Sequence, residues 1–176
     1  MKRITLSAAA IFFSCMLLVS CNTATPETYF DQAVLNSNLL VGFAGKEPLR
    51  ELAYPSAKMD ANNKTVAMPR MEMIQSKIEF AETTLKKIKD LKETPDTKEM
   101  LQTSKALYEY VLPVYKTAYT ELAKLYDDGA SKALIESKAH AIHEAHYARY
   151  DELYSKLISE GKLFANRHSI KVNWAM

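Results

Sequence analysis

Three histidines in the second half of the chain are the side chains whose types and spacing invite a chemical interpretation. The cluster consists of His140, His143 and His146, with further polar neighbours at Glu136, Glu144 and Tyr147. Side chains three or four residues apart are neighbours on a helix, and neutral imidazoles so placed can share a metal ion. His140, His143 and Glu144 are therefore the candidate metal ligands of this sequence.

The spacing of these histidines differs from that of well-known helical metal sites. It is not the His-Glu-x-x-His pattern, whose histidines lie four residues apart, and the chain has no Glu-x-x-His pair of the di-iron type. The three rings fan over roughly 120° of the predicted helix. His146 falls inside its apolar stripe, whereas His140 falls on its polar side. Two interpretations stay open: ordinary surface and core-edge histidines, or contact with a metal or haem.

Tyrosine is the second residue type that could form a site. Several of the ten tyrosines fall at the margins of predicted core stripes: Tyr108, Tyr115, Tyr119, Tyr126, Tyr147, Tyr150 and Tyr154. They could pack at the core boundary with their hydroxyls in water. They could also form an aromatic recognition surface, because Tyr is enriched in the energetic centres of interfaces.

The sequence lacks the other usual signs of catalysis. With four glycines in all it has no glycine-rich phosphate loop, and no serine lies in a recognisable nucleophile elbow. The paired carboxylates Asp127 and Asp128 sit at a predicted helix end, where turn chemistry explains them. We therefore expect that the protein is not an enzyme and binds no cofactor.

Apolar periodicity predicts an all-α domain. Four amphipathic helices are expected at about 27–44, 71–94, 95–126 and 131–160. Short connections between the later helices favour an antiparallel four-helix bundle. A long loop at 45–69 separates the first two helices, and a short C-terminal tail begins at Lys162.

Several residues mark the expected ends and bends of these helices. Thr94 is the predicted N-cap of the third helix, and Gly161 the predicted end of the fourth. Pro113 lies opposite the core stripe of the third helix, where it should bend that helix and leave the core face intact. Trp174, the only tryptophan, should pack the tail back against the bundle.

The first predicted helix is apolar on two sides. Its second stripe contains Leu35, Leu39 and Phe43. A helix apolar on both sides is usually buried between neighbours, so the long loop could cover this stripe, or the stripe could dock a partner. Leu35, Leu39, Phe43 and Trp174 are therefore the candidate partner-binding residues.

The first twenty residues read as a secretion signal. Lys2 and Arg3 precede an uncharged apolar run of about 16 residues, short of the roughly 20 that span a bilayer. The run ends in Leu18-Val19-Ser20-Cys21, which resembles the lipobox of bacterial lipoproteins. The resemblance covers the leader alone and implies cleavage before Cys21 and acylation of that cysteine. Residues 1–20 would then be a signal peptide, 21–28 a lipidated tether and 29–176 the helical domain.

Removal of such a leader changes the bulk properties of the chain. The net charge of +2 falls to zero, so there is no reason to expect nucleic acid as a partner. Cys15 leaves with the signal and Cys21 carries lipid, so no thiol remains for a disulfide or a metal site. In lipoproteins, acidic residues directly after the cysteine often mark inner-membrane retention or surface export. None follows Cys21, which favours the periplasmic face of the outer membrane.

These observations predict a membrane-anchored, non-catalytic lipoprotein. It would act as a scaffold or accessory subunit of an envelope complex, such as a secretion or transport apparatus. Its partners would be the membrane, through Cys21, and an envelope protein. The alternative is a periplasmic bundle that binds a ligand, a metal or haem through His140, His143 and His146.

Overall fold

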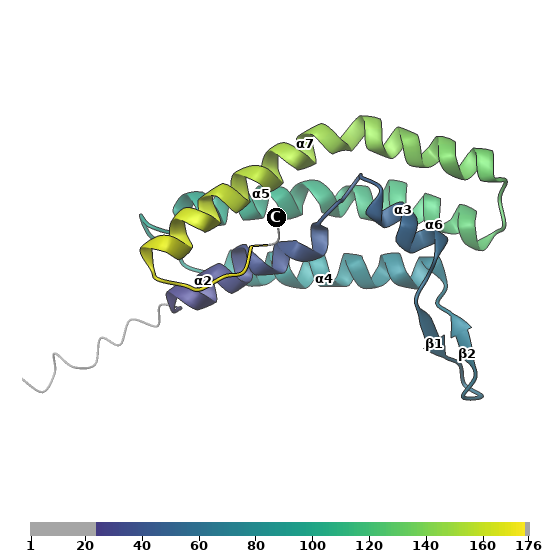
Figure 1. Cartoon of the computed structure of the whole chain (residues 1–176), viewed down its shortest axis with the longest axis horizontal. Helices are drawn as coiled ribbons and strands as arrows, with labels where there is room; N and C mark the ends of the chain where they lie inside the picture. Colours follow the sequence, from purple (N-terminus) through teal and green to yellow (C-terminus); the bar gives the residue numbers. More distant parts are fainter. Residues whose placement is uncertain (1–23, 175–176) are drawn as a thin grey trace, which may run out of the picture.

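A computed structural model describes residues 24–174, and the predicted all-α class is confirmed (Figure 1). Most of the described chain is helical, with one two-stranded sheet in addition. Within 24–174 no helix is both long and apolar enough to cross a membrane.

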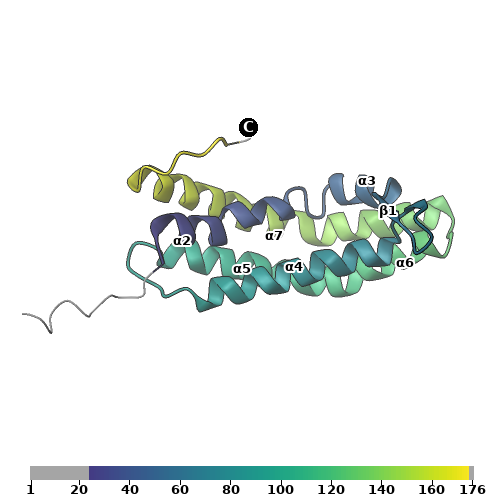
Figure 2. The ribbon, with the colours of Figure 1, turned by 90° about the horizontal axis from the view of Figure 1, so that it is seen from below.

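Three long helical segments form the body of the molecule. They are α4 (Arg70–Asp90), a second segment made of α5 (Lys98–Val114), η3 (Tyr115–Tyr119) and α6 (Thr120–Asp127), and α7 (Lys132–Arg167). They lie along the long axis and alternate in direction (Figures 1 and 2). The apolar stripe predicted for α4 is buried at Ile74, Ile78, Ala81 and Ile88, whereas its first member, Met71, is exposed. Helical periodicity therefore predicted this part of the fold correctly.

The first predicted helix is wrong as a single element. The chain forms α2 (Pro26–Ala33), breaks at Val34 and continues as the 3₁₀ helix η2 (Leu35–Leu40). The Ser37 hydroxyl donates to the Val34 carbonyl at 2.6 Å, and serine and asparagine compete in this way with helical hydrogen bonds. Gly42 and Ala44 then adopt positive φ angles of 73° and 59°. The predicted antiparallel four-helix bundle is accordingly not confirmed.

The predicted 45–69 loop contains regular structure. The short helix α3 (Glu47–Ala53) forms its first part. Strands β1 (Ala57–Met59) and β2 (Thr65–Ala67) pair antiparallel, with Lys58 opposite Val66. Their turn is held by the Asp60 carboxylate, which accepts from the backbone N–H groups of Asn62 and Lys64. The resulting hairpin projects from the helical body (Figure 1).

The third predicted helix begins three residues later than expected, since α5 starts at Lys98 after an N-cap at Thr97, although Thr94 still forms a capping hydrogen bond. The Thr94 hydroxyl accepts from the Thr97 backbone N–H at 3.2 Å, as an N-cap does. The Thr97 hydroxyl accepts in return from the Thr94 N–H at 3.0 Å. Residues 95–97 form a turn that leads into α5 at Lys98.

Pro113 is exposed, as predicted, and a π-helical turn follows it at η3. A π turn inserts one extra residue into the helical repeat. The positions that face the core therefore change after Val114, and Tyr115 and Tyr119 are both buried.

Gly161 does not end the fourth helix, because α7 continues through it to Arg167. A Cβ atom at Gly161 would lie 2.8 Å from Cγ1 of Val34. The glycine is needed for this close approach of the N-terminal segment to α7. The prediction that Gly161 ends the helix is therefore wrong, because this glycine, inside α7, allows close packing of Val34.

The C-terminal tail folds back, as predicted from Trp174 (Figure 2). The Trp174 ring packs edge-on against Phe30 of α2, with ring centroids 5.8 Å apart. Ile170 and Val172 are partly buried against the same core.

Candidate docking surfaces

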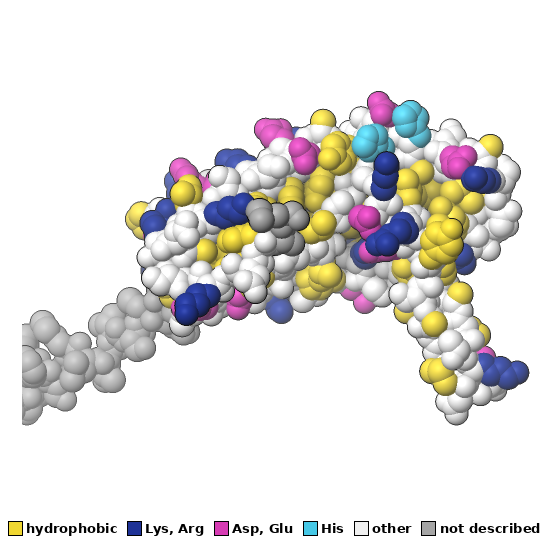
Figure 3. Space-filling model, viewed as in Figure 1, with side chains coloured by type: hydrophobic (Ala, Val, Ile, Leu, Met, Phe, Trp, Pro, Cys, Tyr) yellow, Lys and Arg dark blue, Asp and Glu magenta, His cyan; other side chains and the backbone are white. Residues whose placement is uncertain are grey.

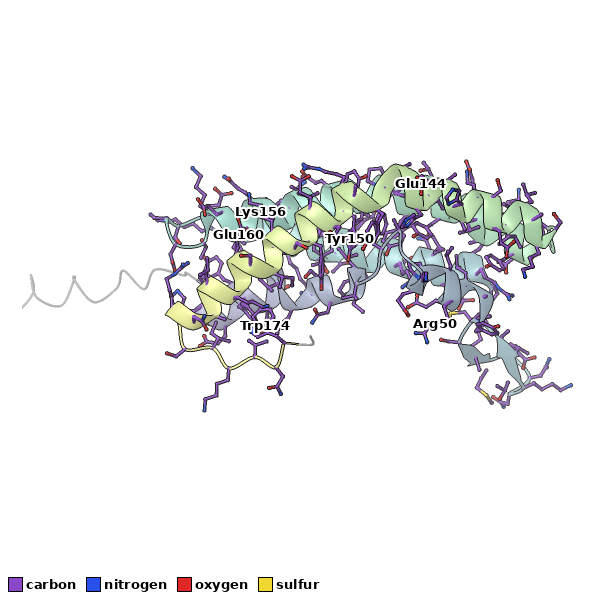
Figure 4. The ribbon with its side chains drawn as sticks, turned by 45° about the horizontal axis from the view of Figure 1, so that its top comes forward. Arg50, Glu144, Tyr150, Lys156, Glu160 and Trp174 are labelled. Atoms are coloured by element: carbon purple, nitrogen blue, oxygen red, sulfur yellow. The ribbon has the colours of Figure 1, made fainter. Side chains whose placement is uncertain are left out.

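Each of the three histidines has a different neighbour in the fold. His143 Nδ1 lies 2.8 Å from the Ala44 carbonyl, which can only accept, so this nitrogen carries the proton. His146 Nδ1 lies 3.1 Å from the Tyr110 hydroxyl, and partial burial lowers its pKa. His140 is exposed, 3.9 Å from a Glu144 carboxylate oxygen. Glu144 is labelled in Figure 4, on the outer side of α7.

This arrangement does not gather a ligand set. Among residues 24–174 no three His, Cys, Asp or Glu side chains lie where they could hold one metal ion. The candidate ligands His140, His143 and Glu144 do not converge, because the His143 ring is turned toward the Ala44 backbone.

Four of the tyrosines form a buried cluster instead of a core margin. Tyr108, Tyr115, Tyr119 and Tyr150 are all nearly inaccessible, so neither interpretation, hydroxyls in water or an exposed recognition surface, holds for these four. The Ala44 N–H donates to the Tyr119 hydroxyl at 3.0 Å, and the Tyr150 hydroxyl donates to the Leu40 carbonyl at 2.6 Å. Figure 4 shows Tyr150 on the inner side of α7. The hydroxyls of Tyr119 and Tyr150 therefore hold the backbone at the end of η2 and just after it.

Burial changes the acidity of these phenols. Desolvation raises the pKa of Tyr119 to about 12 and raises the pKa values of Tyr108, Tyr115 and Tyr150 above their usual range.

Phe43 belongs to the same cluster. It is fully buried, with its ring centroid 5.1 Å from that of Tyr115 and 5.3 Å from that of Tyr150. We call Phe43, Tyr115, Tyr119 and Tyr150 the aromatic floor. Phe43 is thus part of the core, and its assignment as a partner-binding residue is wrong.

The remaining predicted partner-binding residues lie at the surface or close to it. Leu35 and Leu39 are exposed on η2, and Val41 follows them. Trp174, in the C-terminal tail, is partly buried against the core. Leu35 and Trp174 line one hollow of about 430 Å³, whereas Leu39 lines a separate one of about 210 Å³ beside α4.

Sequence reasoning missed the end of the molecule that carries the hairpin. Five of the ten exposed large hydrophobic side chains among the described residues gather there: Tyr54, Met59, Val66, Met71 and Leu134. We call these five residues the distal surface, because this end lies opposite α2, where the described chain begins (Figure 1). Figure 3 shows hydrophobic side chains on the hairpin and beside it. Strands of three residues are too short for alternation to be recognised in the sequence.

A hollow of about 550 Å³ lies next to the distal surface, between α3, α6 and α7. Its apolar lining comes from Leu49, Ala53, Tyr54, Tyr126, Ala130, Ile135 and Ala139. Arg50, Lys132 and Glu136 complete the lining, and Arg50 and Lys132 are highly exposed.

The neighbouring start of α4 is rigidly attached to this end. The Asp127 carboxylate of α6 accepts from the backbone N–H groups of Arg70 and Met71, both at 3.0 Å. A carboxylate at a helix N-terminus satisfies unpaired donors and complements the helix dipole. The hairpin therefore leaves the body from a firmly held helix end.

Comparison with known proteins identifies no relative: no protein family, no curated protein and no solved structure matches this chain. The predicted signal peptide and Cys21 lie outside the described residues. The candidate binding surfaces are thus the distal surface with its hollow, and the separate hollow that Leu35 and Trp174 line.

Proposed function

We propose that this protein is a lipid-anchored, non-catalytic docking module of the bacterial cell envelope whose distal surface binds a protein partner. The observation that carries the proposal is the gathering of exposed apolar side chains at one end of the molecule. Exposed apolar groups that cluster often mark interaction sites, whereas scattered ones need no explanation.

The position of this surface suits an anchored module. Acylation of Cys21, as the lipobox resemblance implies, would attach the lipid within a few residues of α2. The distal surface lies at the other end of the long axis (Figure 1). A helix of 36 residues such as α7 spans about 54 Å, because each residue adds about 1.5 Å. The module would therefore hold its partner well away from its own anchor.

The chemistry around the hollow indicates the kind of segment that would bind. Its apolar lining accepts an aromatic or aliphatic side chain, and Tyr54 stands at its edge with 82% of its surface exposed. Arg50 is paired with Glu47 and Lys132 with Glu136, so the charges around the hollow are balanced. We therefore expect an apolar anchor residue without a strongly charged flank.

The proposed setting is the periplasmic face of the outer membrane, in an assembly such as a secretion or transport apparatus. The absence of acidic residues directly after Cys21 supports that location. We also propose that the fold is a four-helix bundle whose first helix is the broken segment from α2 to α3.

The rival function, binding of metal or haem through the histidines, has less support. His143 and His146 each have a neighbour in the fold that accounts for their positions. The rival predicts that replacement of His140 and His143 by Ala abolishes metal or haem uptake by the full-length protein. We expect uptake no better than micromolar and unchanged by the substitutions.

The docking proposal is tested by purifying the acylated protein from membranes and identifying what accompanies it. Tyr54→Glu combined with Met59→Glu should remove a specific accompanying protein, because charge on the distal surface opposes apolar docking. Both side chains are exposed, so the fold should persist, which circular dichroism would verify.

Two further variants decide where docking occurs. Leu163→Glu changes a residue 58% exposed, close to the 60% of Met59, on a different part of the molecule and should retain the partner. Leu39→Glu tests the surface predicted from sequence. Loss of the partner with Leu39→Glu alone would move the docking site to η2 and contradict the distal assignment.

A further inference from the structure

An apolar groove lies between η2, the second half of α7 and the C-terminal tail. It encloses about 430 Å³, within the range of small-molecule sites in proteins. Figure 4 shows Trp174 on the tail beside α7. The groove lies along the middle of the body, apart from the distal surface, so a ligand here would leave protein docking at the distal end possible.

The contact between Val34 and Gly161 of α7 forms the floor of the groove. Because Gly161 has no side chain, η2 approaches α7 closely at this point. A glycine within a helix costs about 1 kcal/mol relative to alanine, so its presence in α7 fits a requirement for this approach. The walls that rise from the contact are mainly apolar: Leu35, Val41, Tyr154, Ile158, Val172 and Trp174.

One charged side chain lines this groove. Lys162 extends from α7 and places its ammonium 5.5 Å from the centre of the Trp174 ring. The described residues give it no carboxylate partner, whereas nearby Lys156 pairs with Glu160. The other polar side chains of the lining are the neutral Asn38 and Asn173.

A shallower hollow continues from the groove across the outside of α7. It shares Tyr154, Ile158 and Lys162 with the groove and adds the hydroxyls of Ser155 and Ser159. Lys162 therefore stands where the apolar groove opens onto a polar surface. This is the arrangement that an amphiphile with a single negative head group requires.

We propose that this groove binds a long-chain carboxylate, with the alkyl chain between η2 and the tail and the carboxylate on Lys162. Charge complementarity selects the carboxylate, because Lys162 is the only charged residue of the lining. The apolar walls bind the alkyl chain through the hydrophobic effect.

The single tryptophan of the sequence provides the assay. The full-length protein, reconstituted in phosphatidylcholine liposomes, is titrated with stearate brominated in mid-chain, and quenching of Trp174 fluorescence is followed. Saturable quenching is expected. Lys162→Gln should weaken binding about tenfold, because it removes a charge-assisted contact, and Lys162→Arg should restore it. Lys171→Gln, a charge change in the tail outside the lining, should have no effect.

Two controls separate the groove from the bilayer. Asn38→Phe fills the groove from an exposed position and should abolish saturable quenching, whereas quenching from stearate in the membrane would survive it. Brominated octadecanol should bind equally to the wild type and to Lys162→Gln, because it lacks the carboxylate. Equal stearate affinity in the wild type and Lys162→Gln, or unchanged saturable quenching in Asn38→Phe, would overturn the proposal.

Discussion

The helix α4 and the segment 34–45 are both packed in the core, yet they are held there by different means. In α4 the backbone hydrogen bonds are internal to the helix, and a regular stripe of Ile74, Ile78, Ala81 and Ile88 is buried. In 34–45 the backbone forms short-range turn hydrogen bonds, and side chains of distant helices supply further partners. Tyr150 binds the Leu40 carbonyl, and Tyr119 and His143 bind the N–H and carbonyl of Ala44.

The difference shows how an irregular segment can be as well ordered as a helix. A buried backbone group must find a hydrogen-bond partner, and outside a helix or sheet that partner has to come from elsewhere. Here the partners lie 75, 99 and 110 residues away in the chain. Tyr119, Tyr150 and His143 therefore add side-chain hydrogen bonds to a segment that lacks the regular internal hydrogen bonds of α4.

The largest effect is expected from alkaline pH. Burial raises the pKa values of Tyr108, Tyr115, Tyr119 and Tyr150, so the folded state favours their neutral form. Their stabilising contribution is complete below the unfolded pKa of about 10 and is lost as the pH rises above it. Exposed phenols such as Tyr54 should ionise first, and the phenolate absorbance of the buried ones should then rise in one cooperative step with the loss of helical circular dichroism. Ionisation of all ten tyrosines while the helices persist would contradict the aromatic floor.

Removal of the Phe43 ring should give the next largest effect. Phe43→Ala leaves a cavity above Tyr115 and Tyr150 and should cost about 3–5 kcal/mol of unfolding free energy in urea. Leu39→Ala, at a residue 57% exposed, should change it by less than about 0.5 kcal/mol. Similar costs for both would mean that the second apolar stripe is one continuous surface, as the sequence suggested.

Two tyrosine-to-phenylalanine substitutions compare a hydroxyl that has a partner with one that has none. Tyr150→Phe removes one of the two donors to the Leu40 carbonyl, which keeps the Phe43 N–H at 3.0 Å, and should cost about 0.5–1.5 kcal/mol. The Tyr108 hydroxyl is buried beside Thr84 without a hydrogen bond of normal geometry, so Tyr108→Phe should cost less than Tyr150→Phe. Urea unfolding measures both. A larger loss for Tyr108→Phe would contradict the role of the hydroxyls in holding 34–45.

The smallest effect should come from Asp96, which belongs to neither region. A hydrogen bond from His168 and the charge of Arg167 lower the pKa of Asp96 below its usual 3.8. Its contribution is therefore present above that pH and is lost as the pH falls below it. Asp96→Asn should cost less than about 1 kcal/mol at neutral pH, because the carboxylate is largely exposed. The cost should vanish in acid; a cost that persists at low pH would show that it does not arise from the charge.

The wrong predictions for Tyr115, Tyr119 and the 27–44 helix share one origin, the assumption of an unbroken helical repeat. An unbroken repeat of 3.6 residues places Tyr115 and Tyr119 at the edge of the core, but the π turn of η3 brings both inside. The same repeat makes 27–44 one helix, although Ser37 binds the Val34 carbonyl and the chain breaks there. A periodic pattern contains no information about a single inserted residue or a local competing hydrogen bond.

The sequence by itself determined the helical class, the long helices α4 and α7, the cap at Thr94 and the packing of Trp174, because apolar spacing and capping act locally. Only the tertiary structure decided the break at Val34, the burial of Phe43, the role of Gly161 and the separation of the histidines. The last three depend on contacts between residues far apart in the chain, such as Val34 with Gly161 or Ala44 with His143. The break at Val34 accompanies the local hydrogen bond from Ser37, which a periodic pattern does not reveal. The distal hairpin was missed for another reason, since strands of three residues are stabilised by their pairing across the turn and show no alternation in the sequence.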